Sequence, residues 1–287
     1  AGLLAARVLS DHYEQVFVID REKELGDQSP RKGAPQGRHV HAFLPRGVAA
    51  LEKLFPGIFD EIIGAGATNG DLCGDAQWCP GGHRLRRSVS DLGVIAATRP
   101  FTESFITRRV QEISNIQFLY DTIGIGFRAE RGKITGVKVR DRAGQERIEK
   151  ADIFVDAAGR ASQLTKWLKE NGYRTPREER ITVNLHYATV RFKRSTAANN
   201  DLKAVIIGAA PDIPRGGFAQ AVEHDVLQCS MAAYASDLPT DIDEFVEYAK
   251  SLPFTDLYDW IRDAKPMDDI VKTHRVPVAY RRHLDRV

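Results

Sequence analysis

Residues 1–22 read AGLLAARVLSDHYEQVFVIDRE, and this stretch decides the fold. Residues 3–10 place apolar side chains at helical intervals among good helix formers. Residues 16–20 (VFVID) are rich in β-forming residues and end in Asp20. The pattern predicts a helix, a short loop and a strand that ends in an acidic residue, as in a βαβ unit. In dinucleotide-binding βαβ units a glycine-rich turn opens the helix, and an acidic residue about 20 positions later binds the ribose.

Gly2 and Asp20 match the second half of that motif, because 18 positions separate them. Gly2 fits the third glycine of G-x-G-x-x-G, which lets the helix and the strand pack closely. We expect the first strand and the first two glycines to lie before residue 1. Arg21 is placed either to contact a nucleotide phosphate or to form a surface ion pair. The alternative is a plain βαβ unit in which Asp20 caps a turn.

The rest of the chain alternates helices with strands up to about residue 172 and is richer in strands after it. Residues 123–149 alternate polar and apolar side chains, which predicts a β-meander. We expect an α/β fold in two parts, one Rossmann-like and one a mixed sheet with helices, so that the whole chain has an α+β layout. The predicted helices cover 3–10, 46–54, 100–113, 163–171, 240–251 (with Thr240 as N-cap) and 256–264. The predicted strands cover 16–20, 115–121, 151–156, 181–193, 203–208, 216–233 and 270–279. Further strands and a PGG turn are predicted within 71–98.

Three further stretches favour an anion or nucleotide site. Gly37, Arg38, His39 and His41 crowd together just before a helix, where backbone N–H groups and cations suit a phosphate or a flavin edge. A polar loop is the alternative. Arg99 stands at the start of the next predicted helix and is expected to clamp a phosphate.

The third stretch, IFVDAAGRASQL, runs from an apolar strand through small residues into a helix. Asp156 is the carboxylate at the strand end, and Gly159 permits close approach of the backbone to a ligand. A generic strand-to-helix turn is the alternative.

Composition excludes several classes of protein. The net charge is +2 and basic residues alternate with acidic ones, which argues against nucleic acid as a partner. No apolar run approaches the roughly 20 residues of a transmembrane helix. The odd number of cysteines, without a secretory leader, favours a reduced, cytoplasmic location. Cys73, Cys79 and His83 are one ligand short of a structural zinc site, so we expect no metal.

Together these residues resemble the FAD-dependent oxidoreductases built like p-hydroxybenzoate hydroxylase. That group includes aromatic hydroxylases, squalene-epoxidase-like and polyether epoxidases, flavin halogenases and geranylgeranyl reductases. Gly2 resembles the last glycine of the FAD fingerprint, and Asp20-Arg21 the acid-arginine pair after the second strand. Arg99 resembles the arginine of the S/T-R-x-x-x-E element, and DAAGRAS at 156–162 the second flavin motif. Residues 36–58 are most similar to bacterial enzymes of the 2-polyprenyl-6-methoxyphenol hydroxylase and epoxidase type.

The chain departs from this pattern at two places. Ala158 stands where aromatic hydroxylases have the Asp of G-A-D-G, and Asp156 lies two residues earlier, which is closer to the halogenase, reductase and epoxidase branches. After RRHLDRV the family continues with a Gly-Asp-Ala element and a glycine-rich loop against the flavin ring. We therefore expect a fragment that lacks both ends and is inactive alone.

The resemblance implies an FAD-dependent monooxygenase that takes electrons from NAD(P)H. A flavin hydroperoxide would insert one oxygen atom into an aromatic or polyene (isoprenoid) small molecule, by hydroxylation or epoxidation. The alternatives are a geranylgeranyl-reductase-like enzyme, a halogenase, and a non-catalytic dinucleotide-binding module. Trp78, Trp167 and Trp260 are far apart in the sequence, so the Trp-x-Trp-x-Ile-Pro stretch of halogenases is absent. This makes a halogenase less favoured. No catalytic acid or base is identified, and the oligomeric state is left open.

The implied cofactor-binding residues are Gly2, Asp20, Arg21, Arg38, Arg99, Asp156 and Gly159. The Rossmann-like FAD-binding domain, with its first strand missing, is expected to comprise residues 1–70 and 96–172. A mixed sheet-and-helix substrate domain, with its C-terminal flavin loop missing, is expected to comprise 71–95 and 173–287. A lipophilic substrate would place the protein at the periphery of a membrane.

Overall fold

The computed structural model describes residues 1–23, 30–31, 33–159, 162–194, 201–234 and 238–282, the last ten of these by their backbone alone. The chain forms two compact units. Unit 1 comprises Ala1–Ser29, Glu103–Glu179 and Tyr280–Val287, and unit 2 comprises Pro30–Thr102 and Arg180–Ala279. Segment 30–70, which the sequence groups with the FAD-binding part, thus belongs to unit 2. Which segments bind FAD remains a prediction.

Unit 1 contains a short parallel sheet. Helix α1 (Gly2–Leu9) leads into strand β1 (Val16–Ile19), which pairs in parallel with β6 (Ile116–Leu119), so that Val16 lies opposite Ile116. Helix α4 (Arg99–Gln111) begins in unit 2 and ends in unit 1, before β6. Ala6 of α1, Val16 of β1 and Ile116 of β6 are buried, whereas Val8 and Phe17 are exposed, so α1 and β1 each pack through one face.

An antiparallel meander completes unit 1, as predicted from the alternation over 123–149. Its strands are β7 (Thr122–Glu130), β8 (Lys133–Asp141) and β9 (Glu146–Glu149), in the order β7-β8-β9. Helix α5 (Leu164–Glu170) packs against β7 through Trp167, whose ring meets Phe127 edge-on at 5.2 Å and stacks on Tyr173 at 5.4 Å. Aromatic contacts of this kind stabilise a short helix that has little intrinsic stability.

The prediction of a strand at 151–156 is wrong. This segment has no strand structure and pairs with no described strand, and its apolar side chains Ile153 and Val155 are about half exposed. A strand needs a neighbour for its backbone N–H and C=O groups, and apolar composition alone does not provide one.

Unit 2 is built on a six-stranded sheet in the order β14-β10-β13-β12-β11-β4. Its strands are β4 (Ala76–Cys79), β10 (Arg177–Lys193), β11 (Ala204–Ile207), β12 (Arg215–Val222), β13 (Val226–Tyr234) and β14 (Val271–Arg282). Strands β10, β13, β12 and β11 pair antiparallel, and β4 joins β11 in parallel. A tight turn with left-handed His224 and Asp225 joins β12 to β13.

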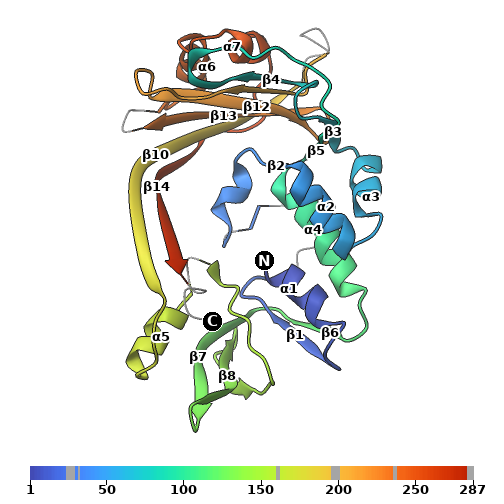
Figure 1. Ribbon diagram of the computed structural model, residues 1–287, viewed down its shortest axis with the longest axis vertical. Helices are drawn as coiled ribbons and strands as arrows, with labels where there is room; N and C mark the ends of the chain where they lie inside the picture. The colour runs from blue at the N-terminus through green and yellow to red at the C-terminus, as the bar shows by residue number, and fades with distance from the viewer. Residues whose placement is uncertain (24–29, 32, 160–161, 195–200, 235–237, 283–287) are drawn as a thin grey trace. The chain divides into compact units, whose positions relative to one another are not determined.

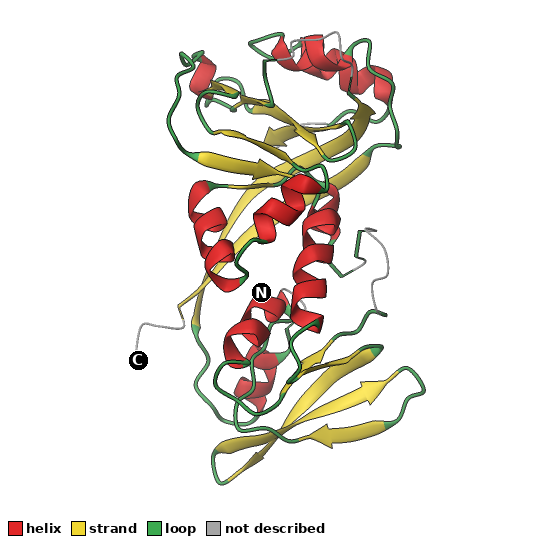
Figure 2. Ribbon diagram, turned by 90° about the vertical axis from the view of Figure 1, so that its right-hand side faces the viewer, coloured by secondary structure: helices red, strands yellow, loops and turns green. Residues whose placement is uncertain are grey.

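Helices α6 (Ile242–Lys250) and α7 (Asp256–Ile261) cover one face of this sheet (Figures 1 and 2). Between them lies the main core, which includes the fully buried side chains Phe192, Met231, Phe245 and Leu257. The N-cap of α6 is Asp241, which accepts a hydrogen bond from the Glu244 amide at 2.9 Å, so the prediction of Thr240 is off by one residue. Asp is the stronger cap, and Thr240 binds the Glu244 carboxylate instead.

A second, three-stranded sheet of unit 2 has the order β2-β5-β3. Its strands are β2 (Ala42–Phe43), β3 (Thr68–Asp71) and β5 (Gly93–Ala96), and its neighbours along the chain are α2 (Pro45–Leu54), α3 (Ile58–Gly64) and the 3-10 turns η1 (Pro35–Arg38) and η2 (Pro80–Gly82). Among the described residues, no helix combines the length and the apolar character needed to cross a membrane.

Candidate functional site

The six-stranded sheet of unit 2 has one apolar face and one face with polar side chains. Met231 and its alternate neighbours on β13 belong to the core beneath α6 and α7. Because side chains alternate along a strand, Gln228 and Ser230 of β13 point to the opposite face. Thr189 of β10 and Phe218 of β12 both lie opposite Ser230 and share that face.

A buried chain of hydrogen bonds ties the segment before β2 to this polar face. Nδ1 of His39 lies 2.7 Å from Oγ1 of Thr189, which lies 2.5 Å from Oγ of Ser230. Burial lowers the pKa of His39, and the nearby His41 lowers it further. The imidazole of His39 is therefore neutral near pH 7, and the sheet fixes its position.

The start of α4 is held by the turn between β12 and β13. Glu223, only 5% exposed, accepts hydrogen bonds from the backbone N–H of Thr98, at 2.9 Å, and from the Thr98 hydroxyl. The ring of Phe101 meets His224 of the same turn edge-on at 5.8 Å. Arg99 follows Thr98 directly, so a contact 125 residues distant along the chain fixes the helix end that carries this arginine.

Arg38 and Arg99 lie on neighbouring parts of unit 2. A Cβ added to Gly37 would lie 3.8 Å from Cδ of Arg99, so the glycine lets the arginine side chain pass close to η1. Both arginines are exposed, and no hydrogen bond or ion pair of either guanidinium is found among the described residues. Nε2 of Gln228 donates to the Arg38 carbonyl at 3.2 Å and fixes its backbone. The two cations are thus available to an anionic ligand.

An apolar pocket with a volume of about 210 Å³ lies between the two sheets of unit 2. Its lining includes apolar side chains of both sheets, among them Leu44, Trp78, Val94, Ile206 and Phe218. Polar side chains are also present: His41 and Gln220, Asp71, and the ion pair of Lys203 with Asp75 at 2.9 Å. Such a pocket, mostly apolar with a few polar groups, is typical of a small-molecule site.

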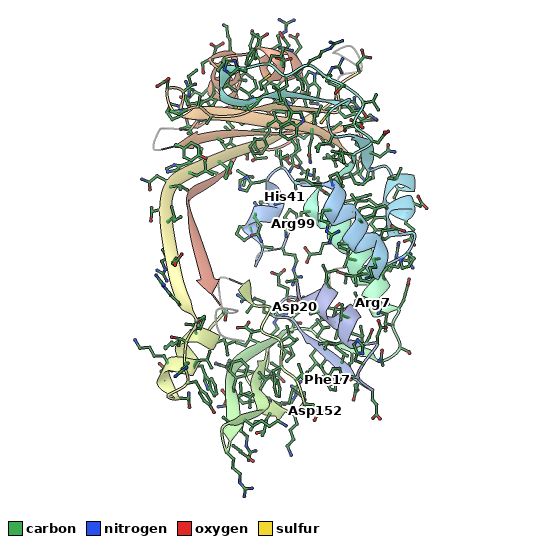
Figure 3. The ribbon with its side chains drawn as sticks, viewed as in Figure 1. Arg7, Phe17, Asp20, His41, Arg99 and Asp152 are labelled. Atoms are coloured by element: carbon green, nitrogen blue, oxygen red, sulfur yellow. The ribbon has the colours of Figure 1, made fainter. Side chains whose placement is uncertain are left out.

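His41 presents one ring nitrogen to ligands. Its Nδ1 lies 2.7 Å from the carbonyl oxygen of His39, which accepts, so Nδ1 carries the proton and Nε2 is left as an acceptor. Figure 3 shows His41 and Arg99 in unit 2. Burial lowers the pKa of His41, the hydrogen bond to the His39 carbonyl opposes this, and the charge of Arg99 adds to the lowering. Nε2 of Gln220 donates to the His41 carbonyl at 2.5 Å and fixes the backbone just before β2.

Unit 1 holds the other predicted site residues. A Cβ added to Gly2 would lie 3.3 Å from Cβ of Ala157, so the start of α1 abuts the loop 156–159. The first N–H groups of a helix have no partner within the helix and attract anions. Asp20 follows β1, and its Oδ1 accepts from the Glu22 amide at 3.0 Å (Figure 3). Arg21, beside it, is exposed.

The loop after residue 155 is shaped by its own carboxylate. Asp156 accepts hydrogen bonds from the Ala158 amide at 2.9 Å and from the Ser162 hydroxyl. Gly159 has a φ of 61°, a left-handed conformation that favours glycine. The structure thus gives Asp156 a role in its own loop, and contact of Asp156 or Gly159 with FAD remains a prediction.

The predicted residues therefore form two groups. Gly2, Asp20, Arg21, Asp156 and Gly159 lie in unit 1, and Arg38 and Arg99 lie in unit 2. In unit 1 a helix start beside a loop of small residues and an acid after a parallel strand fit the adenosine and pyrophosphate of FAD. In unit 2 two exposed guanidinium groups fit its anionic part.

Sequence reasoning missed several residues that build this region: Thr189, Phe218, Gln220, Glu223, Gln228 and Ser230. One signal was present. Strands β12 and β13 read RGGFAQAV and VLQCSMAAY, in which Gln220, Gln228 and Ser230 are polar residues of one face in otherwise apolar strands. Polar residues at a period of two in such strands indicate a face that meets ligand or polar groups.

Comparisons with known proteins agree with this fold. No family model matches the chain. It is 34% identical over 226 residues to the protein Rv3254 of Mycobacterium tuberculosis, an alignment that covers 74% of the chain and 47% of Rv3254. The chain thus spans about half the length of the curated relative it matches.

Solved structures of low sequence identity share the architecture. PqsL, a probable FAD-dependent monooxygenase from Pseudomonas aeruginosa, matches with a TM-score of 0.69 and 12% identity over 94% of this chain and 69% of PqsL. The flavin-dependent brominase Bmp2 matches with a TM-score of 0.70 and 11% identity over 95% of this chain and 64% of Bmp2. The p-nitrophenol 4-monooxygenase PnpA from Pseudomonas putida matches with a TM-score of 0.66 and 14% identity over 97% of this chain and 65% of PnpA. The chain therefore shares the fold of these three structures, in agreement with the fold predicted from its sequence.

Proposed function

We propose that the protein containing this chain is an FAD-dependent monooxygenase that hydroxylates or epoxidises an aromatic or polyene small molecule. The observation that carries the proposal is the apolar pocket of unit 2, because it adjoins β2, which follows the Arg38 element. The balanced reaction consumes the substrate, O₂, NAD(P)H and a proton, and yields the oxygenated product, NAD(P)⁺ and water. NAD(P)H and the free thiols of Cys73, Cys79 and Cys229 suit a cytoplasmic location.

In this proposal FAD is bound by the residues that the sequence assigns to the cofactor. The N–H groups at the start of α1 bind its pyrophosphate, Asp20 binds the adenosine ribose, and Arg38 and Arg99 bind its anionic part. These residues come from segments 1–70 and 96–172, which the sequence assigns to the cofactor. Bound FAD supplies the redox chemistry, namely the transfer of electrons from NAD(P)H and the activation of O₂.

The side chains of the pocket select and orient the substrate. The apolar walls exclude water, which protects reactive species from side reactions. His41 is neutral near pH 7, and its Nε2 accepts a hydrogen bond from a substrate hydroxyl or amine. Lys203 is already paired with Asp75, so none of the lining residues, all of which are described, offers an unpaired cation. An uncharged substrate fits this lining better than a carboxylate.

The first test is the visible spectrum of the protein purified from the complete reading frame that encodes this chain. We expect a flavin spectrum, and we expect Asp20→Ala and the double variant Arg38→Ala/Arg99→Ala each to lower the FAD content at least tenfold, because each loses charge-assisted contacts worth about 1.5–3 kcal/mol. Arg46→Ala, which removes an exposed arginine of α2 in the same unit, is the matched control and should keep its flavin. A folded protein without flavin would contradict every enzymatic version of the proposal.

The second test is consumption of NAD(P)H in the presence and absence of O₂. A monooxygenase consumes NAD(P)H with O₂ when an aromatic or polyene compound is added, and it yields a product heavier by one oxygen atom. Substrate reduction without O₂ indicates a reductase instead, and halide incorporation indicates a halogenase. His41→Leu should raise KM for a hydroxylated substrate about tenfold, the value of one hydrogen bond, and leave KM for its deoxy analogue unchanged.

A further inference from the structure

Residues His83–Leu92, here called the rim segment, form an exposed strip between β4 and β5. Val89 is 81% exposed and Leu85 is 51% exposed, and both are large apolar side chains. Arg84, Arg86 and Arg87 are exposed in the same ten residues, whose acidic side chain is Asp91. Scattered apolar residues are ordinary on a protein surface, but apolar and cationic side chains gathered on one short segment indicate a binding surface.

Hydrogen bonds tie the rim segment to the sheets of unit 2. The Leu85 amide donates to the Trp78 carbonyl at 2.9 Å, and Nε2 of Gln77 donates to the Leu85 carbonyl at 3.0 Å. Further along, the amide and hydroxyl of Ser90 donate to the Asp71 carboxylate at 3.0 and 2.8 Å. The exposed side chains between these anchors are therefore presented from a fixed backbone.

The anchor at Asp71 holds over a wide pH range. Burial alone would raise the pKa of Asp71, but hydrogen bonds from Gly74, Ser90 and Cys73 outweigh it and bring the pKa well below its usual range. The carboxylate therefore stays ionised, and stays bound to Ser90, throughout the neutral and mildly acidic range.

The rim segment borders the apolar pocket. Asp71, Leu72 and Trp78 line the pocket, and each is hydrogen-bonded to the rim segment, Leu72 through its amide and the Leu92 carbonyl at 2.9 Å. Leu44, another lining residue, is 54% exposed. The rim segment and the adjoining pocket thus both carry apolar side chains.

The charge of the rim segment indicates its partner. Arg84 is engaged within the chain, because it pairs with Asp256 at 2.5 Å and lies over the ring of Phe254. Arg86 and Arg87 are exposed. Among the described residues, the hydrogen bond of their guanidinium groups is a long one, from Arg87 to the Gly74 carbonyl at 3.4 Å. Apolar side chains beside arginines match the interface of an anionic bilayer, where the former enter the headgroup region and the latter bind phosphates.

We propose that the rim segment docks the protein on an anionic lipid bilayer, with the apolar pocket beside the docked surface. The docking goes beyond the proposed oxygenation and does not depend on it. Leu85 and Val89 enter the interface, and Arg86 and Arg87 contact lipid phosphates. A single short segment gives reversible binding rather than stable anchoring.

Sedimentation with lipid vesicles tests the proposal on the protein from the complete reading frame. We expect binding to phosphatidylcholine vesicles that contain phosphatidylglycerol, and much weaker binding to phosphatidylcholine alone. Arg86→Ala/Arg87→Ala should weaken binding about 25-fold, since each arginine near an anionic surface contributes about fivefold. Lys133→Ala/Arg142→Ala removes the same charge from the exposed meander of unit 1 and should change binding less than twofold.

The apolar side chains distinguish a bilayer from an acidic protein surface. Leu85→Ser/Val89→Ser keeps every charge and should weaken vesicle binding at least fivefold. Circular dichroism of each variant shows that it is folded. The proposal is overturned if the protein does not bind anionic vesicles, or if the two control substitutions weaken binding as much as those at Arg86 and Arg87. It is also overturned if binding depends on the arginines but not on Leu85 and Val89, because the surface then recognises anions in general.

Discussion

In unit 1 the carboxylates of Asp20 and Asp156 accept hydrogen bonds from groups two to six residues away. On the polar face of unit 2 and in the turn beside it, the partners lie far along the chain: Thr98 binds a residue 125 positions away, and His39 binds one 150 positions away. Local bonds form wherever the short motif occurs, whereas the distant ones exist only when the whole sheet is assembled. The polar face of unit 2 therefore depends on tertiary structure, and substitutions there should be felt by the entire unit.

The largest expected difference between the units concerns two glycines. A Cβ added to Gly216 of β12 would lie 2.5 Å from the Ile207 carbonyl oxygen and 3.0 Å from the Ala209 amide, which are backbone atoms. A Cβ added to Gly136 of β8 would lie equally close to the side-chain methyl Cγ2 of Ile148, which can turn away, and its nearest backbone atom, the Glu149 carbonyl oxygen, would be 3.3 Å away. Gly216→Ala should therefore destabilise unit 2 by about 3 kcal/mol, and Gly136→Ala should destabilise unit 1 by about 1 kcal/mol.

Tryptophan fluorescence can follow each unit separately during urea unfolding. Trp167 lies in unit 1, and Trp78 and Trp260 lie in unit 2. In a Trp167→Phe background the signal reports unit 2 alone, so the loss caused by Gly216→Ala can be assigned. Equal losses for the two glycine substitutions would show that the strands of unit 2 yield as easily as a side chain.

The next effect concerns the Glu223 carboxylate. Glu223→Ala leaves the buried amide and hydroxyl of Thr98 without their acceptor, which should destabilise unit 2 by about 2–3 kcal/mol. Glu223→Gln keeps one acceptor oxygen and should destabilise unit 2 by about half as much as Glu223→Ala. Asp156→Ala removes two similar bonds from an exposed loop and should leave the unfolding midpoint of unit 1 unchanged. A Glu223→Ala midpoint equal to wild type would mean that water replaces the carboxylate.

A smaller effect is expected at the buried hydroxyls. Thr189→Val leaves His39 and Ser230 without their shared partner and should lower stability by about 1–2 kcal/mol, whereas Thr189→Ser keeps the hydroxyl and should cost less. In unit 1 the hydroxyl of Thr122 donates to the Tyr120 carbonyl two residues away, so Thr122→Val orphans one acceptor and should cost under about 1 kcal/mol. Urea midpoints of the three variants rank these losses. An unchanged midpoint for Thr189→Val would mean that the chain of hydrogen bonds does not support unit 2.

The same contrast explains what could be predicted from the sequence. Periodicity predicts α1, β1 and the meander, because the apolar pattern of each is visible in a short stretch of sequence. The strand expected at 151–156 does not form, since its apolar pattern lacks a paired neighbour among the described residues. Arg38 and Arg99 are identified as candidates from the residues around them. The groups that position them, Gln228 of β13 and Glu223 of the turn before it, lie more than 120 residues away along the chain. Only the register of the folded sheet brings such groups together.

The smallest effect expected is the dependence of stability on pH. Burial is the main cause that lowers the pKa of both His39 and His41 below 6.5, so the folded state binds protons less readily than the unfolded state. The stabilisation is complete above pH 6.5 and is lost as the pH falls through the unfolded value toward the lower folded pKa values. The urea midpoint of unit 2 should therefore decrease as the pH falls from about 7.5 to 5.5. His39→Asn and His41→Asn should each make this dependence of the midpoint on pH less steep. His39→Asn should also lower the midpoint at neutral pH. If both variants keep the wild-type slope, other groups titrate in this range, and the buried histidines do not link protonation to the polar face of unit 2.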